Sequence, residues 1–292
     1  MGDSVGETTA LKSAFSAAPD ISAVLSWPQV VASVTTLERA GEIQLAYRLV
    51  KPKPEVAEET TRSIINERLQ GALENEAKCS SSPCKVIGLG QDCMAADLGT
   101  KWGFGSLLVD GPFIAGVFSR NGSATALEDG LIGFVECSYH KLTRTPSGLN
   151  ALTIPKYHAF LNHEVGPYWI DRSTDRIVGL YARRVAAFRE ALAKSPVLFV
   201  FSQTREADPD RLAQALDQFS PGANFRILVV DHSEDSAFAK EFRDGRVSYM
   251  ASRKPRADYV WHVPSCYNTP EGLAFERPIA QSLMAALERF AS

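Results

Sequence analysis

Cys93 is the residue of this chain whose surroundings best suit nucleophilic chemistry. It follows residues 85–88, a short apolar run that predicts a buried strand. Gly88 and Gly90 permit a tight turn, and Asp92 is a good N-cap for a helix that begins with the letters MAADL. Cys93 is therefore expected in the first turn of that helix. Free backbone N–H groups and the helix dipole there favour a thiolate and can hold an oxyanion.

The same stretch has two other interpretations. Cysteine is also a small apolar packing residue, and glycines before a helix can bind a phosphate without any thiol chemistry. The letters GLGQDC do not complete the dinucleotide-binding pattern, because that pattern needs glycine where Cys93 stands.

A nucleophilic thiol needs a general base, and the base needs a partner that holds its tautomer. Of the five histidines, His163 has the most suitable context, within the segment HAFLNHE at residues 158–164. His262 and then His232 are the alternatives. Asp110, in LLVDGPF, is either a turn former or a carboxylate that orients the imidazole.

Arg183 and Arg184 fall on a predicted helix, either as part of a solvated face or as a clamp for a phosphate or carboxylate. We expect Arg184 to bind substrate, together with Gly90, Gln91 and Asp92.

Composition excludes several classes of protein. The chain has 292 residues and a formal net charge of -3, and its Lys and Arg residues form no basic stripe, so we expect no nucleic-acid partner. No apolar run is long enough to span a membrane, and the first residues lack the pattern of a secretory signal. Five cysteines, an odd number, favour a reducing compartment over a disulfide framework. These features predict a cytoplasmic location. Cys79 and Cys84 have no second pair to complete a metal site, so none is expected.

The predicted domains are a flexible tail over residues 1–20, a helical region over 21–78 and an α/β catalytic domain over 85–292. Residues 23–50 predict two helices joined at Gly41, which form a cap or an arm for homo-oligomerisation. Further helices are predicted at 55–78, 173–193, 210–219, 236–242 and 271–290. Strands are predicted at 85–88, 104–109, 132–137, 197–201, 226–230 and 259–263, with a polar loop at 143–150.

Apolar strands that alternate with amphipathic helices predict an α/β fold, with a mostly parallel sheet flanked by helices and a helical N-terminal region. Sheets of this kind bind ligands at the carboxyl ends of their strands. Besides Cys93, the residues expected near that edge are Ser202, Gln203, Asp231, His232 and His262.

The strings KVIGLGQDCMAADL, VDGPF, FLNHE, YARRVAAFREAL and VLFVF occur in this order between residues 85 and 230. In this order and spacing the chain resembles the bacterial DUF1796 group, whose members are described as papain-like cysteine peptidases. The resemblance implies that Cys93 is the nucleophile, His163 the base and Asp110 the aspartate of the group's Phe-Asp-Trp segment.

The turn before Cys93 is also similar to that of WcbI-type capsule-polysaccharide acetyltransferases, which implies coenzyme A as a ligand. We therefore expect a cysteine-dependent enzyme of acyl transfer or hydrolysis. It would need no cofactor and would act on a small-molecule, peptide or acyl-thioester substrate. The alternatives are a coenzyme A-dependent acetyltransferase of surface-polysaccharide synthesis and a non-catalytic module that binds an anion or a partner.

Overall fold

The computed structural model of the chain describes residues 4–17, 25–50, 59–90, 92–114, 116–170, 173–203, 207–232 and 245–291. Its contacts divide it into two units that are interleaved in sequence. Unit 1 comprises Met1–Ser82, Asp97–Leu107 and Lys254–Gln281, and unit 2 comprises Pro83–Ala96, Leu108–Arg253 and Ser282–Ser292. Helices α5 (Met94–Lys101) and α10 (Pro270–Ala291) each begin in one unit and end in the other.

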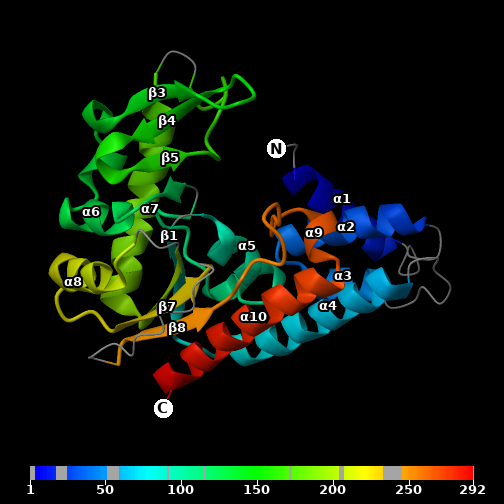
Figure 1. Ribbon diagram of the computed structural model, residues 1–292. Helices are drawn as coiled ribbons and strands as arrows, with labels where there is room; N and C mark the ends of the chain where they lie inside the picture. The colour runs from blue at the N-terminus through cyan, green and yellow to red at the C-terminus, as the bar shows by residue number, and fades with distance from the viewer. Residues whose placement is uncertain are drawn as a thin grey trace. The chain divides into compact units, whose positions relative to one another are not determined.

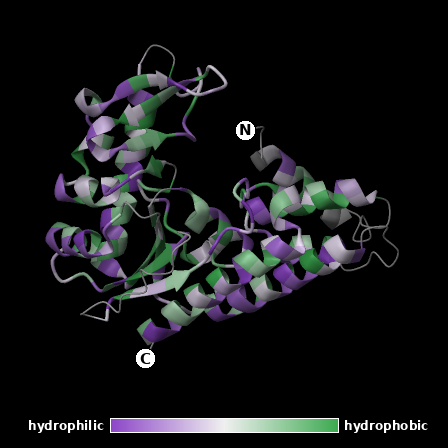
Figure 2. Cartoon of the chain, viewed as in Figure 1, coloured by the Kyte–Doolittle hydropathy of each residue, from purple (hydrophilic) through white to green (hydrophobic). Residues whose placement is uncertain are grey.

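Unit 2 is built on a four-stranded parallel sheet (Figure 1). Its strands, in spatial order, are β1 (Lys85–Gly90), β6 (Val197–Gln203), β7 (Phe225–Asp231) and β8 (Val247–Ala251). The strands are hydrophobic along their length (Figure 2), and consecutive residues of β1, β6 and β7 are buried, as expected of a sheet that is covered on both sides. The predicted α/β class, with a parallel sheet flanked by helices and a helical N-terminal region, is confirmed.

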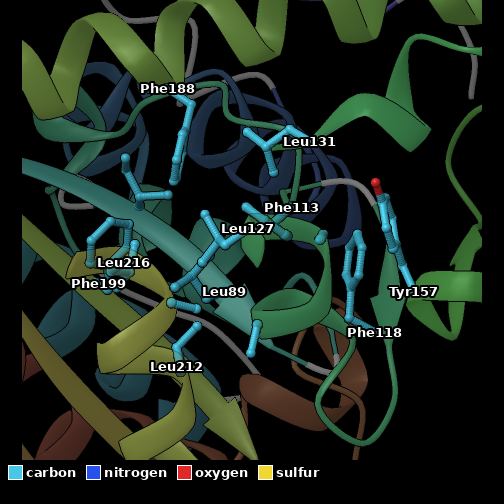
Figure 3. Packing of buried hydrophobic residues seen from close by; sticks show 14 of the residues in the cluster. Leu89, Phe113, Phe118, Leu127, Leu131, Tyr157, Phe188, Phe199, Leu212 and Leu216 are labelled. Carbon is cyan, nitrogen blue, oxygen red and sulfur yellow. The ribbon is translucent and has the colours of Figure 1, made fainter. Parts of the chain in front are cut away.

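Helix α7 (Asp175–Lys194) leads into β6, helix α8 (Pro209–Phe219) connects β6 to β7, and both bury their apolar faces. The ring of Phe188 on α7 lies 6.0 Å from the ring of Phe199 on β6 (Figure 3) and 5.7 Å from that of Phe219 on α8, measured between ring centroids. Helix α8 begins at an N-cap, because the Asp208 side chain accepts the N–H groups of Asp210 and Arg211.

A second sheet of unit 2 is antiparallel, in the order β2-β5-β4-β3. Its strands are β2 (Val117–Phe118), β5 (Ala159–Leu161), β4 (Asn150–Ile154) and β3 (Lys141–Arg144). Short helical segments accompany it, namely α6 (Gly122–Glu128), η3 (Ile132–Phe134), η4 (Cys137–Tyr139) and η5 (Pro155–Tyr157). Phe118 and Tyr157 (Figure 3), together with Phe134, join these segments to the same hydrophobic cluster as the parallel sheet.

Unit 1 is helical. It contains α1 (Ser4–Ala17), α2 (Trp27–Arg39), α3 (Ile43–Val50), α4 (Glu59–Cys79), η2 (Gly105–Leu107) and α9 (Pro264–Tyr267), with parts of α5 and α10. Helices α2 and α3 form the predicted hairpin, and Gly41 between them has φ +74°. Val34, Leu37 and Leu69 are among the residues that bury the helices against one another. Among the described residues, no helix is both long and apolar enough to cross a membrane.

Several predicted elements are wrong. The expected tail at 1–20 contains helix α1 over Ser4–Ala17. The expected strand at 104–109 is a 3₁₀ turn with one bridge to β1, and residues 132–137 contain the 3₁₀ turns η3 and η4. Residues 259–263 form turns, because the N–H of Tyr259 donates to Arg256 and that of Val263 to Val260. The sequence reading also missed the hairpin β3–β4 and the edge strand β8, and the helix predicted at 236–242 lies outside the described residues.

Candidate functional site

The carboxyl edge of the parallel sheet gathers several of the predicted residues. The strand register sets Gly90 beside Ser202, and residue 203 beside Asp231. Gly90 has φ +113°, and a Cβ built on it would lie 2.2 Å from the carbonyl oxygen of Ser202. Only glycine can occupy this position, so the chain turns sharply at the point where β1 ends.

Asp92 fixes the segment between that turn and α5. Its Oδ1 accepts the N–H of Met94 at 3.1 Å, and its Oδ2 accepts the hydroxyl of Ser202 on β6 at 3.2 Å. Helix α5 begins at Met94, so Cys93 directly precedes the helix instead of lying in its first turn. Gln91, predicted to bind substrate, lies outside the described residues.

Cys93 differs from the other four cysteines in its exposure. All five are free thiols, and Cys79, Cys84 and Cys266 are buried, whereas Cys137 is exposed and Cys93 is half-buried. Burial raises the pKa of Cys79 to about 11, despite the nearby Lys78. Cys93 thus combines partial solvent access with a position at the carboxyl edge of the sheet.

Arg184 on α7 holds two carboxylates that are far apart in the sequence. Its Nε donates to Asp110 Oδ1 at 2.8 Å, and its Nη1 donates to Glu164 Oε1 at 2.8 Å. The hydroxyl of Tyr181 donates to the other oxygen of Glu164 at 3.1 Å. The Glu164 and Arg184 side chains are 4% and 11% exposed, whereas that of Asp110 is 63% exposed.

The electrostatics of this cluster keep Arg184 charged. Burial opposes the charged form of Arg184, but the Glu164 carboxylate and the neighbouring Tyr181 outweigh it and raise the Arg184 pKa. Burial and the same carboxylate raise the pKa of Tyr181 well above its ordinary value. The hydroxyl therefore stays protonated and donates a hydrogen bond to Glu164.

Arg184 thereby links the segments that contain Asp110 and His163, two residues that the sequence predicts to lie in one site. Asp110 follows Val109, whose N–H donates to Val86 of β1 at 3.0 Å. Glu164 follows His163, which is half-buried. The carboxylate of Asp110 therefore binds a guanidinium, and its predicted role toward an imidazole stays a prediction.

The other histidines occupy different places. His232 follows Asp231 at the end of β7, and its Nδ1 lies 2.8 Å from the carbonyl oxygen of Ser252. A carbonyl only accepts, so Nδ1 carries a proton and Nε2 can act as a base in the neutral ring. His262 is exposed and lies in unit 1, outside any strand, whereas Cys93 lies in unit 2.

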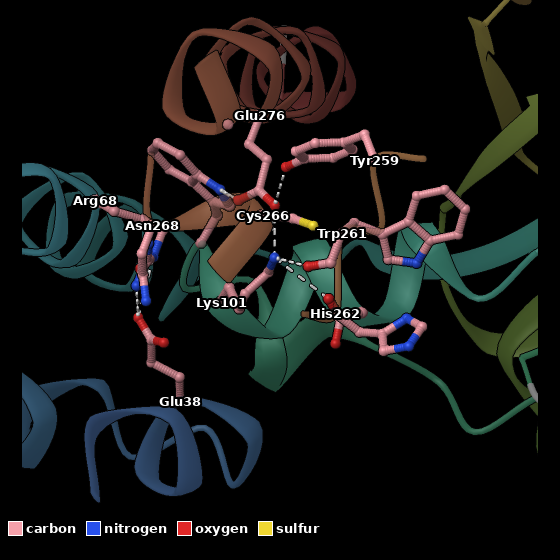
Figure 4. A network of polar contacts seen from close by, with 12 residues as sticks. Glu38, Arg68, Lys101, Tyr259, Trp261, His262, Cys266, Asn268 and Glu276 are labelled. Atoms are coloured by element: carbon pink, nitrogen blue, oxygen red, sulfur yellow. Dashed lines mark hydrogen bonds and ion pairs between the residues drawn. The ribbon is translucent and has the colours of Figure 1, made fainter. Parts of the chain in front are cut away.

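Unit 1 contains a second polar cluster, which the sequence reading missed (Figure 4). Lys101 Nζ donates to Glu276 Oε1 at 2.6 Å and to the carbonyl oxygen of Trp261 at 2.6 Å. Glu276 also accepts the indole N–H of Trp102 at 3.1 Å and the hydroxyl of Tyr259 at 3.3 Å. The Lys101 and Glu276 side chains are only 3% and 1% exposed.

A second ion pair of this cluster lies between Arg68 and Glu38. Arg68 donates to Glu38 Oε1 through Nη2 at 2.6 Å and to Asn268 Oδ1 through Nη1 at 2.7 Å. The ring of Tyr267 lies 4.8 Å from the Arg68 guanidinium carbon and 4.0 Å from the ammonium of Lys101. Lys101 Nζ also lies 3.3 Å from Asp97 Oδ2, so two cations of this network face three carboxylates.

The sequence does contain a signal for this cluster. Arg68 lies on the buried stripe of α4, between Ile65 and Leu69, where an apolar residue is expected. A charged residue on an apolar stripe indicates a buried partner, although it does not identify that partner.

No metal centre emerges from the described ranges, since they contain no group of three or more His, Cys, Asp or Glu side chains arranged to hold an ion. Comparison with known proteins found no match to this chain among protein-family models, curated proteins or solved structures.

Proposed function

We propose that this chain is a cysteine-dependent enzyme of acyl transfer or hydrolysis, with Cys93 as the nucleophile and His163 as the general base. The observation that carries the proposal is the half-buried thiol directly before α5, at the carboxyl edge of a parallel sheet. Asp92 supports it, because its two hydrogen bonds hold the backbone around Cys93 in place.

The assignment of His163 as the base draws support from its neighbour. Glu164 is held by Arg184 and Tyr181, so the backbone that carries His163 is fixed. The same arginine binds Asp110, which lies just beyond the segment paired with β1. Arg184 is then a positioning residue, since both its described hydrogen bonds go to side chains of this chain.

In the proposed reaction His163 takes the thiol proton, and the Cys93 sulfur forms a bond to the carbonyl carbon of an amide or thioester. Backbone N–H groups at the start of α5 stabilise the oxyanion. The carbon–nitrogen or carbon–sulfur bond of the substrate then breaks, and the leaving group receives the proton from His163. Water, or a hydroxyl acceptor in a transferase, attacks the acyl-enzyme and restores the thiol.

The test is the rate at which iodoacetamide alkylates Cys93 near neutral pH. The structure describes all five cysteines, and Cys137 is the exposed one, so the assay uses a Cys137→Ser background to remove its competing thiol. We expect alkylation faster than that of glutathione and a slower rate in His163→Ala. A matched control is His158→Asn, because His158 is exposed in the same segment and has φ +46°, which asparagine tolerates. Labelling no faster than that of glutathione would overturn the proposal.

The same preparation distinguishes the acceptor chemistry. Thermal stabilisation by coenzyme A, without any by peptides, would favour an acetyltransferase of surface-polysaccharide synthesis over a hydrolase of the papain-like type.

A further inference from the structure

Strand β3 is an edge strand whose outer side offers backbone hydrogen bonds. Within the described part of the chain it pairs only with β4. The N–H of Thr145 donates to the carbonyl of Leu149 at 2.9 Å, so this pair is hydrogen-bonded. Hydrogen-bonded and non-hydrogen-bonded pairs alternate along antiparallel strands. It follows that Leu142 and Arg144 direct their N–H and C=O groups to the open edge.

The opposite strand bears out this alternation. Asn150 is paired with Arg144, and its carbonyl oxygen accepts the N–H of Gly166 at 2.7 Å, on the side away from β3. Figure 1 shows β3 at the outer side of the antiparallel sheet.

The charge at this edge is positive. From Ser138 to His163 the sequence contains Lys141, Arg144 and Lys156 but no Asp or Glu. Lys156 is paired with Asp129 at 2.5 Å. The two cations of β3 are exposed and have no ion pair with any described residue.

Apolar surface accompanies the charge. The Leu142 side chain, between these cations, is 62% exposed, and Leu149 at the end of the hairpin is 42% exposed. Edge strands commonly carry Lys or Arg to prevent pairing, but an exposed leucine between two unpaired cations leaves an edge suited to an anionic partner.

We propose that the open edge of β3 binds an extended acidic peptide segment by strand addition. In antiparallel register, the peptide places an acidic residue opposite Arg144, an apolar residue opposite Leu142 and a second acidic residue opposite Lys141. The sequence Glu-Thr-Val-Glu meets this pattern. A second copy of the chain is a poorer partner, because pairing two β3 strands along their open edges would bring four cations together and supply no carboxylate.

The binding does not depend on the proposed chemistry of Cys93. It is therefore measured on the full chain with Cys93→Ser, by the fluorescence anisotropy of a labelled peptide that contains Glu-Thr-Val-Glu. The result cannot be confused with failure of the enzymatic proposal, since no reaction takes place.

Two N-methylated peptides test the edge geometry without altering the protein. Methylation of the first Glu and of Val blocks the N–H groups that face β3, and we expect binding to be lost. Methylation of Thr and of the second Glu blocks the N–H groups that face away, and we expect binding to be retained. Equal affinity of the two methylated peptides would overturn the proposal.

Charge reversal tests the electrostatic part. Lys141→Glu/Arg144→Glu is expected to weaken binding about tenfold or more, since two attractive cross-strand pairs become repulsive. The control Lys78→Glu/Lys194→Glu makes the same change at two exposed positions on α4 and α7, and it should bind as the parent does. Binding of a Lys-Thr-Val-Lys peptide as tight as that of the acidic one, or no effect of the β3 variant, would refute the proposal.

Discussion

Replacement of Arg184 by methionine should destabilise unit 2 far more than loss of the exposed hydrogen bond between Arg184 and Asp110 would. Methionine keeps much of the side-chain volume but removes both donors, and it leaves the Glu164 carboxylate, 4% exposed, with only the Tyr181 hydroxyl as a described donor. Removal of one partner of a buried ion pair costs about 3–5 kcal/mol. Asp110 is 63% exposed, so its pairing with Arg184 contributes under about 1 kcal/mol.

The assay is native-state hydrogen exchange of the α7 amides, because it reports on this helix alone, whereas a global transition combines contributions from both units. We expect the exchange free energy of α7 to fall by about 3–5 kcal/mol in Arg184→Met and by less than about 1 kcal/mol in Asp110→Asn. The double variant Arg184→Met/Glu164→Gln should recover a large part of the loss, since no charge then remains buried.

Two results would refute this reasoning. If Asp110→Asn destabilises α7 as much as Arg184→Met does, the stability comes from the exposed Arg184–Asp110 pair and not from the buried Arg184–Glu164 pair. If the double variant is no more stable than Arg184→Met, the cost comes from lost packing of the arginine and not from an uncompensated carboxylate.

Three further outcomes follow from the described contacts. Gly90→Ala should lower the free energy of unfolding by several kcal/mol and abolish selective labelling of Cys93. Gly41 also has positive φ but has open space around it, so Gly41→Ala should lower the free energy of unfolding by only about 1–2 kcal/mol in thermal unfolding. Burial lowers the pKa of His140 below 6.5 in the folded protein, so below about pH 6.5 the unfolded state binds more protons than the folded state. The free energy of unfolding should therefore fall as the pH drops below about 6.5, and His140→Asn should flatten this pH dependence in urea titrations. Glu276→Gln leaves Lys101 with Asp97 as its remaining carboxylate and should cost up to about 3–5 kcal/mol, and Lys101→Met/Glu276→Gln should cost less, by hydrogen exchange of the α10 amides.

The parallel sheet could be predicted because its strands are continuous apolar runs, as in VLFVF and RILVV, and both of their faces are buried. An apolar run fails to predict a strand where its residues are buried without a partner strand. Tyr259 and Trp261 alternate with less buried residues as a strand would, but both are buried in unit 1, where the Tyr259 hydroxyl donates to Glu276 and the Trp261 carbonyl accepts from Lys101. Strand β8 was missed because an edge strand, with half-buried Ser248 and Met250, has no continuous apolar signal.

The candidate site was predictable where its determinants are local. The turn at Gly90 and the cap at Asp92 depend on neighbours in sequence, and both were anticipated. Arg184 was expected to bind substrate, but its described hydrogen bonds go to carboxylates 74 and 20 residues away, and single-sequence patterns do not report such distant partners. For the same reason the Arg68–Glu38 pair could not be found from the sequence, although the position of Arg68 on an apolar stripe signalled a buried partner.

The most direct test of the central claim is intact-mass analysis after brief exposure of the protein to a thioester or an activated ester. The account predicts one added acyl group per chain, located on Cys93 by peptide mapping, absent in Cys93→Ser and slower to form in His163→Ala. An acyl group found on Cys137 or on surface lysines, with Cys93 unmodified, would contradict it.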